Sequence, residues 1–252
     1  MSFDLLDDSD FPQFQLSPPD PRDEAHAFRV DDAPRGANGG DHIIAHKRER
    51  RIQIGPTCGG NSAAFAIGAA YDVAGRTSEE FSGSGLWALA QLVPSVDVDA
   101  SAGAWLRFIF WSAMRRGAPT REEHGEIRLA PPTAACLLSM DVARFEYKYL
   151  SSAAGVLSGS PLIPGIREAV YSNMPVAIAG LVGTDQGNLV DGGVMDVESE
   201  PSATHAMVVD GIEYVAGVER FRIRDWASQR QYFWATAGFF RFIYEGWAIR
   251  AL

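Results

Sequence analysis

Apolar residues in the first half of the chain recur three and four positions apart, the spacing that places them on one face of a helix. This pattern predicts helices from Thr57 to about Ala74, from Ser78 to Val93 and from Gly103 to Arg116. The first of these helices is rich in small residues and stops at Gly75. We therefore expect it to pack closely against its neighbours and to lie centrally in the fold.

The second half of the chain changes to the alternation of apolar and polar residues that is typical of half-buried strands. The alternation is clearest from Arg144 to Leu150, and a short helix is predicted from Ile163 to Ser172. Helices that precede strands in this way indicate an α+β protein in which a helical lobe packs on a sheet lobe. A cleft between two such lobes is a natural place for an active site. The further predicted strands are Pro175–Val182, Ala206–Val209, Arg220–Asp225 and Phe239–Tyr244.

The N-terminal segment, residues 1–45, differs from the remainder because it is rich in proline, glycine and acidic residues, as in Ser17–Glu24 and Asp31–Gly40. Such a segment buries too little apolar surface to offset the entropy lost when the chain becomes ordered. We therefore predict a flexible arm followed by one folded domain, residues 46–252. Within that domain the helical lobe is expected at about 50–140 and the β lobe at about 141–250.

The composition is that of a globular protein with an acidic balance. Hydrophobic residues make up 46% of the 252 residues, and the formal net charge is −10. A chain of this charge lacks the basic surface that attracts nucleic acid or anionic membranes, so we expect neither as a partner. One basic run, Lys47–Arg51, is short and interrupted by Glu49, and it is predicted to be a solvated segment. No stretch approaches the ~20 apolar residues that span a bilayer.

The two cysteines, Cys58 and Cys136, are too few for a disulfide framework or a structural zinc site. This usage suits a reducing compartment, and the acidic N-terminus lacks the basic and apolar regions of a Sec-type signal peptide. We therefore expect a cytoplasmic protein, or one exported by a non-Sec route as an effector. No cofactor and no metal are expected.

Two patterns with metal-ligand residue types are interpreted as structural. His42 and His46 are four residues apart, but their surroundings form a poor helix and supply no third ligand. The run from Asp185 to Asp191 lacks the regular alternation and the final glutamate of a helix-loop-helix calcium site. This run is predicted to be a solvated loop, and Cys136 is predicted to be a core residue.

Candidate chemistry begins at Cys58, which stands at the start of the first predicted helix with Gln53 just upstream. A thiol with a reference pKa of about 8.5 is mostly protonated at neutral pH. The free N–H groups and the positive dipole end of a helix favour the thiolate. A side-chain amide nearby can donate a hydrogen bond to an oxyanion. These two residues are therefore candidates for a nucleophile and an oxyanion donor.

A base and its partner are expected from the second half of the chain. His205 directly precedes the predicted strand Ala206–Val209, and Asp225 ends another strand beside Trp226. A carboxylate can orient an imidazole and stabilise its charged form, as a thiolate–imidazolium pair requires, and an indole ring can shield that hydrogen bond from water. From the residues alone, structural roles stay open for Cys58 as a core residue, His205 as a satisfied polar group and Asp225 as a turn cap.

Several blocks of the chain resemble the papain family of cysteine peptidases, in the order in which that family has them. The block Gln53–Ala66 is similar to the family's oxyanion glutamine and nucleophile helix, Thr204–Tyr214 to its histidine block, and Phe221–Trp226 to the block with the orienting residue. The resemblance spans roughly residues 50–246 and implies a two-lobed, papain-like α+β fold. Further similar blocks are Phe81–Ala90, Ala102–Glu123, Ile166–Ala179, Val190–Asp196 and Gly238–Phe242.

By this resemblance Cys58 is the nucleophile, His205 the base and later the acid, and Asp225 the residue that orients the imidazole. Gln53 and the backbone N–H of Cys58 are the implied oxyanion donors. The chain departs from the family in having aspartate in place of asparagine at Asp225, and Gln53 lies five rather than six positions before Cys58. It also lacks the family's disulfide cysteines, as bacterial, intracellular or effector-like members do. The residues expected to bind substrate are Gly59, which replaces a bulky aromatic of the family, Gly103, Trp105 and Trp226.

The expected activity is hydrolysis of a peptide or isopeptide bond through an acyl-enzyme, with a protein or peptide as the substrate. One alternative is the same thiol chemistry used for deamidation or transglutaminase-type transfer by an effector. A second alternative is a catalytically inactive binding module with the same fold, which Gly59 and the shifted Gln53 leave open. The reactivity of Cys58 relative to Cys136 distinguishes an enzyme from a binding module.

Overall fold

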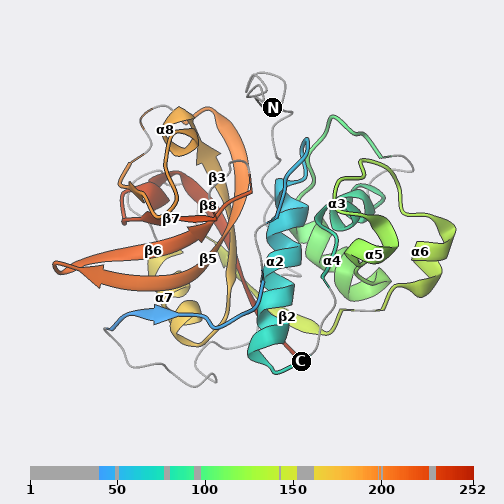
Figure 1. Ribbon diagram of the computed structural model, residues 1–252, viewed down its shortest axis with the longest axis horizontal. Coiled ribbons are helices and arrows are strands. Elements are labelled where there is room, and N and C mark those ends of the chain that lie inside the picture. The colour runs from blue at the N-terminus through green and yellow to red at the C-terminus, as the bar shows by residue number, and fades with distance from the viewer. Residues whose placement is uncertain are drawn as a thin grey trace.

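The computed structural model describes residues 40–48, 51–76, 80–93, 98–141, 143–151, 162–197, 199, 201–226 and 231–252. Residues 1–39, most of the predicted arm, lie outside the described residues. Within the described part, one long helix, α2 (Cys58–Val73), stands between an eight-stranded sheet and a group of helices (Figure 1). This arrangement confirms the predicted α+β class, with the helices early and the strands late in the chain.

Helix α2 is buried on all sides because it lies between the two parts of the fold. Every residue from Cys58 to Tyr71 is buried. The backbone of α2 approaches α3 (Gly83–Gln91) so closely that a Cβ atom at Gly60 would lie 2.0 Å from the carbonyl oxygen of Gly83. Only glycine fits at such a crossing. The close packing predicted from the small residues is therefore confirmed.

The other early helices differ in detail from the prediction. α3 begins at Gly83, five residues after the predicted start, because the side chain of Ser82 caps it there. α4 (Leu106–Arg116) starts close to the predicted place. Two short helices, α5 (Arg121–His124) and α6 (Ala134–Ser139), lie between α4 and the strands of the second half, where the sequence pattern predicted no helix or strand. They are too short to show the apolar period of a helix in the sequence.

The sheet is antiparallel except for one parallel pair, and its two faces are covered differently. Alternate residues of its strands point to α2 and the neighbouring helices, and the residues between them point to a second apolar cluster on the other face. The order is β2-β8-β3-β5-β6-β7-β4, with β1 paired to β5. The strands are β1 (His42–Ile43), β2 (Phe145–Ser151), β3 (Val176–Val182), β4 (Val194–Met195), β5 (Ala203–Val215), β6 (Val218–Arg224), β7 (Tyr232–Ala235) and β8 (Ile243–Ala251), and α7 (Leu162–Tyr171), α8 (Thr184–Gly187) and the 3-10 helix η3 (Phe239–Phe242) accompany them.

Two predicted strands have different limits in the structure. β5 begins at Ala203, so His205 lies inside the strand and not before it. The segment predicted to be a strand from Phe239 starts with η3, and β8 follows it from Ile243. The first difference concerns only the end of a strand. The second is a difference of type, because Phe239–Phe242 form a 3-10 helix in place of the predicted strand.

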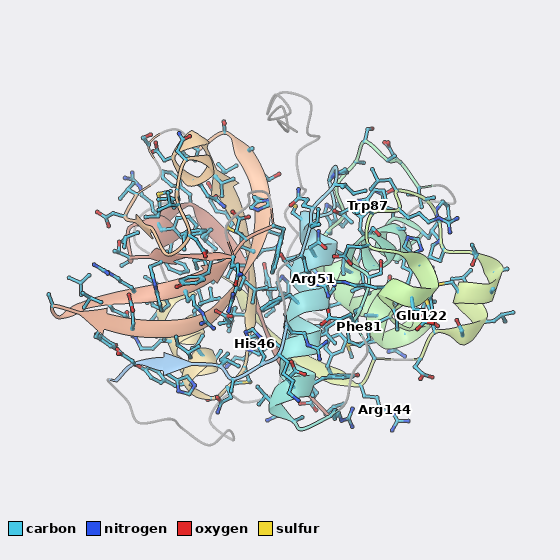
Figure 2. All side chains as sticks on the ribbon, viewed as in Figure 1. His46, Arg51, Phe81, Trp87, Glu122 and Arg144 are labelled. Carbon is cyan, nitrogen blue, oxygen red and sulfur yellow. The ribbon has the colours of Figure 1, made fainter. Side chains whose placement is uncertain are left out.

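The basic run at residues 47–51 is not solvated at Arg48 and Arg51, which corrects the sequence interpretation at these two residues, whereas Lys47 is exposed as expected. The side chain of Arg51 is 1% exposed, donates to the carbonyl of Phe81 at 2.8 Å and pairs with Glu80 at 3.2 Å. Figure 2 labels Arg51 and Phe81 toward the helical part of the molecule. Arg48 pairs with Asp72 of α2 at 2.6 Å. The carboxylates that hold these arginines are 24 and 29 residues away along the chain, so the run itself contains no sign of them.

Within the described ranges, no helix has both the length and the apolar composition that a membrane crossing requires.

Candidate active site

Cys58 is the first residue of α2 and is 4% exposed. The residue before it, Thr57, does not cap the helix with its side chain. Its hydroxyl donates to the carbonyl of Ile54 at 2.9 Å and accepts from Nδ2 of Asn61 at 3.3 Å. The N–H groups of the first turn are therefore not taken up by the side chain of the N-cap residue. Such groups point outward from a helix start and favour negative charge there.

His205 and Asp225 come together because β5 and β6 are neighbours in the sheet. His205 lies near the beginning of β5, and Asp225 directly follows the end of β6. Because the two strands pair antiparallel, the beginning of β5 and the end of β6 lie next to each other, and so do these two residues. Nε2 of His205 lies 2.8 Å from Oδ1 of Asp225, and neither residue is more than 5% exposed. The side chain of Cys58 also acts on the imidazole, since it is among the groups that raise the pKa of His205. With Nε2 directed at Asp225, Nδ1 is the ring nitrogen that remains for the thiol.

The surroundings of His205 favour its charged form. Burial acts to lower the pKa of His205, but hydrogen bonds to Asp225 and Cys58 outweigh burial and raise this pKa to about 10. The imidazole therefore holds its proton at neutral pH. A protonated imidazole beside a cysteine is the arrangement that stabilises a thiolate.

Trp226 connects Asp225 to α2. Its backbone N–H donates to Oδ1 of Asp225 at 2.6 Å, and its indole Nε1 donates to the hydroxyl of Ser62 at 2.9 Å. The indole ring packs on Phe65 with 5.3 Å between ring centroids and is 3% exposed. Ser62 was not among the predicted site residues. Ser62 comes four residues after Cys58, about one helical turn, and this spacing is the sequence signal that places both side chains on the same face of the helix.

Gln186 also reaches the site, which sequence analysis did not predict. It lies in α8, inside the run from Asp185 to Asp191 that was expected to be a solvated loop, but it is 3% exposed. Its Nε2 donates to Oδ2 of Asp225 at 3.1 Å and lies 3.2 Å from Sδ of Met207. The solvated-loop interpretation is therefore wrong at Gln186. A single buried glutamine in a polar run has no periodic signal that identifies it.

Gln53, the predicted oxyanion donor, is engaged within its own turn. Its Nε2 donates to the carbonyl of Gly55 at 3.0 Å. Its Oε1 is buried and has no hydrogen-bond partner among the described residues. Gly55 has a φ of +51°, the left-handed conformation that glycine adopts without strain, and this turn determines where the amide lies.

The other residues predicted to bind substrate lie on the helical side of the site, apart from Trp226. Gly59 is the second residue of α2 and is buried. Trp105 precedes α4, and its ring stacks on Phe108 with 4.7 Å between centroids. The carbonyl of Gly103 accepts from Nε2 of Gln91 at 3.4 Å.

The second cysteine and the remaining histidine candidates lie outside this site. Cys136 is 3% exposed in α6, as expected for a core residue, and burial raises its pKa. His42 bonds to Asn173, and His46 bonds to Asp210. Over the described ranges, no group of three or more histidine, cysteine, aspartate and glutamate side chains is arranged to hold a metal ion.

Solved structures with a similar fold are cysteine proteases at low sequence identity. Xylellain, a cysteine protease from Xylella fastidiosa, is 14% identical with a TM-score of 0.72, and the match covers 96% of each chain. Procathepsin B S9 from Trypanosoma congolense is 14% identical with a TM-score of 0.67, over 98% of this chain and 89% of the other. Bromelain from Ananas comosus in complex with the E64 inhibitor is 12% identical with a TM-score of 0.61, over 82% and 95%.

Comparison of the sequence with protein-family models and with curated proteins gives no match. The likeness is thus one of three-dimensional structure, and it extends over nearly the whole of this chain and of the first two structures. The chain has the papain-like fold that the order of its sequence blocks implied.

Proposed function

We propose that this protein is a cysteine peptidase that hydrolyses peptide or isopeptide bonds in a protein or peptide substrate. The observation that carries the proposal is the line from Cys58 through His205 to Asp225, buried at the start of a helix in a papain-like fold. Cys58 comes from the start of α2, whereas His205 and Asp225 come from the neighbouring strands β5 and β6, Asp225 directly after the end of β6. Free thiols at both cysteines are compatible with the reducing compartment expected for a cytoplasmic protein or a non-Sec effector.

In the proposed reaction the thiolate of Cys58 attacks the substrate carbonyl and forms a tetrahedral oxyanion. His205 then gives its proton to the leaving amine as an acyl-enzyme forms, and it later takes a proton from the water that releases the acid. Asp225 keeps the imidazole oriented and stabilises its charge in both steps. The raised pKa of His205 supports the role of proton donor, because the residue carries a proton at neutral pH.

The proposed oxyanion site is the beginning of α2. The backbone N–H of Cys58 is one donor, and the place of Cys58 as the first residue of the helix supports this role, because the first N–H groups of a helix have no partner within it. Gln53 is the second donor in this proposal. For that role its amide has to exchange the carbonyl of Gly55 for the oxyanion when substrate binds.

The test of this proposal is the replacement of Cys58 by alanine. Cys58→Ala is expected to abolish hydrolysis of a casein-type substrate while the folded structure is retained, because the nucleophile is lost and a buried small residue is replaced by another. The matched control is Cys136→Ala, which removes the other buried thiol and is expected to leave activity unchanged. Hydrolysis that persists in Cys58→Ala contradicts the proposal.

Labelling gives a second measurement that does not need the natural substrate. The bromelain structure contains the inhibitor E64, so E64 is the probe of choice. We expect it to modify Cys58 and to spare Cys136, since burial raises the pKa of Cys136 and its thiol lacks an imidazole partner in the described contacts. Mass spectrometry of treated proteins then separates cleavage from deamidation or transfer, which use the same acyl-enzyme.

A binding module with a papain-like fold is the second candidate function. The bond from Gln53 to Gly55 favours it, because this amide is not directed at an oxyanion. Equal, slow labelling of Cys58 and Cys136 is the result expected of such a module. Selective labelling of Cys58 contradicts it.

A further inference from the structure

The carboxylate of Asp225 is held from two sides inside the protein. Oδ1 accepts from Nε2 of His205 at 2.8 Å and from the backbone N–H of Trp226 at 2.6 Å. Oδ2 accepts from Nε2 of Gln186 at 3.1 Å. Asp225 is 0% exposed, so hydrogen bonds from the protein must replace the water that an ionised carboxylate loses on burial.

We propose that Gln186 is a positioning residue, whose amide holds Oδ2 of Asp225 so that Oδ1 stays directed at His205. This inference rests on the proposed function only where it assigns a catalytic role to the His205–Asp225 pair. The geometry of the hydrogen bonds stands without it. Gln186 acts through Asp225 and is not itself assigned a contact with the substrate.

The local structure fixes the direction of the Gln186 amide. Its Nε2 also lies 3.2 Å from Sδ of Met207, which is two residues after His205 on β5. A hydrogen bond also holds the short helix α8 beside Gln186, because Asp185 accepts from the backbone N–H of Ser199 at 2.9 Å. Rotation of the Asp225 carboxylate would break the bond to Gln186 and turn Oδ1 away from the imidazole. The hydrogen bond from the Gln186 amide therefore opposes rotation of the Asp225 carboxylate.

Aspartate in place of a neutral asparagine makes such a donor necessary. An asparagine has an amide group on one side that donates, whereas both oxygens of a carboxylate accept. A buried acceptor without a donor is costly, and more so when it is charged. Gln186 supplies a donor at the oxygen of Asp225 that does not face His205.

The test is a titration of the Asp225 carboxyl by carbon-13 NMR in wild-type protein and in Gln186→Met. Methionine has a similar length but cannot donate, so the ionised carboxylate is less stabilised. We expect the titration midpoint of Asp225 to move to higher pH by about one unit. The titratable groups that act on His205 beside it are Asp225 and Cys58, and the guanidinium of the preceding Arg224 is engaged by Asp210.

Met207→Leu is the matched control. It changes the other neighbour of the Gln186 amide with little change in volume and leaves the bond to Asp225 in place. The Asp225 midpoint is expected to stay at its wild-type value in this variant. A purely structural role for Gln186 would lower the thermal stability of both variants and leave the midpoint of both unchanged, and that result overturns the proposal.

A second readout connects the pair to the proposed chemistry. The rate of Cys58 alkylation by iodoacetamide is expected to fall about tenfold in Gln186→Met and to stay near wild type in Met207→Leu. A Cys58 that is unreactive already in the wild-type protein, together with an Asp225 midpoint that shifts in Gln186→Met, contradicts the proposed function alone. A Cys58 that is reactive in the wild-type protein, together with an Asp225 midpoint that does not move in Gln186→Met, contradicts the role of Gln186 alone.

A measurement on the wild-type protein covers the case in which Gln186→Met does not fold. The side-chain amide signals of Gln186 are expected to shift with pH at the same midpoint as the Asp225 carboxyl, because the amide bonds to that group. Amide signals that do not follow the titration of Asp225 overturn the proposal.

Discussion

The imidazole of His205 owes its properties to two side chains that are distant from it in sequence. Hydrogen bonds to Asp225 and Cys58 outweigh the effect of burial and keep the ring protonated. Neither bond is visible in the residues around position 205, where the sequence shows only a histidine beside a buried strand. The charge of one residue is therefore a property of the assembled site.

The raised pKa of His205 makes the stability of the protein depend on pH. The folded value of about 10 lies above the unfolded value of about 6.5, so the native state binds the proton more tightly. The stabilisation is complete below the unfolded pKa and is lost as the pH rises through the folded pKa. We expect the unfolding free energy to fall between pH 7 and pH 10 with a slope of up to ~1.4 kcal/mol per pH unit.

Urea unfolding at a series of pH values in this window measures that slope. His205→Gln is the reference, since it retains a polar side chain but does not titrate. Groups outside the site contribute equally to both proteins, so the difference between the two slopes belongs to His205 together with its partners Asp225 and Cys58. Identical slopes would show that the imidazole is not protonated in the native state.

At the scale of elements, the crossing of α2 and α3 determines where the nucleophile helix lies. The contact is set by Gly60, whose added Cβ would meet the carbonyl oxygen of Gly83 at 2.0 Å. A backbone oxygen cannot move aside without shifting the whole helix. This element was also the one most visible in the sequence, because its small residues and its end at Gly75 mark both its packing and its limit.

Gly60→Ala is therefore expected to destabilise the protein by about 2 kcal/mol or more, since the crossing has no room for a methyl group. The matched control is Gly165→Ala in the interior of α7, where the added Cβ would meet the flexible end of Leu150 at 3.2 Å. Alanine favours a helix over glycine, so this control is expected to stay within about 1 kcal/mol of wild type. Thermal and urea unfolding measure both. Equal stability of the two variants contradicts the role assigned to the crossing.

Elements whose signal is short or whose ends depend on capping were predicted less well. α5 and α6 were missed because four and six residues do not complete enough turns to show a period. α3 was placed too early because Ser82, not a residue near 78, caps it. Strand types were correct where the pattern was long, as in the alternation of β2 and the continuous apolar run of β3.

At the scale of the whole molecule, the segment before α2 joins the sheet to the helices. His46 hydrogen-bonds to the fully buried Asp210 of β5, and its ring packs on Phe65 of α2 at 4.9 Å between centroids. Two residues later, Arg48 pairs with Asp72 at the far end of α2. Figure 2 labels His46 between the sheet and α2. The segment thus contacts both sides of the fold through polar and charged side chains.

Asp210 is the centre of this connection, because it also accepts from Arg222 at 2.7 Å and from Arg224 at 2.7 Å. Burial acts to raise the pKa of Asp210, but His46 and the two arginines outweigh burial and hold this pKa well below its usual range. Asp210→Asn leaves the arginines without their counter-charge and is expected to cost about 3 kcal/mol of unfolding free energy. Urea unfolding at neutral pH measures this loss.

The comparison variant is Glu219→Gln, which breaks an ion pair with Arg167. The side chain of Arg167 is 41% exposed. Solvent screens such a pair, so a loss of about 1 kcal/mol or less is expected. A variant at Asp210 that loses no more than the one at Glu219 would show that the buried cluster does not join the two sides. The stabilisation from Asp210 is also expected to decline as the pH falls below about 3.8, through the depressed folded pKa.

The sequence by itself determined the class of the fold, the central helix with Cys58 at its start, the main strands, and His205 and Asp225 as candidates at strand ends. These features follow from periodicity and from residue type, which act over neighbouring positions. Only the tertiary structure decided which side chains hydrogen-bond to one another in the site. The bond from Gln186 to Asp225 spans 39 residues, and the pairing of β5 with β6 brings His205 to Asp225. Periodicity encodes which face of an element is buried, whereas the residue opposite that face depends on how distant elements pack.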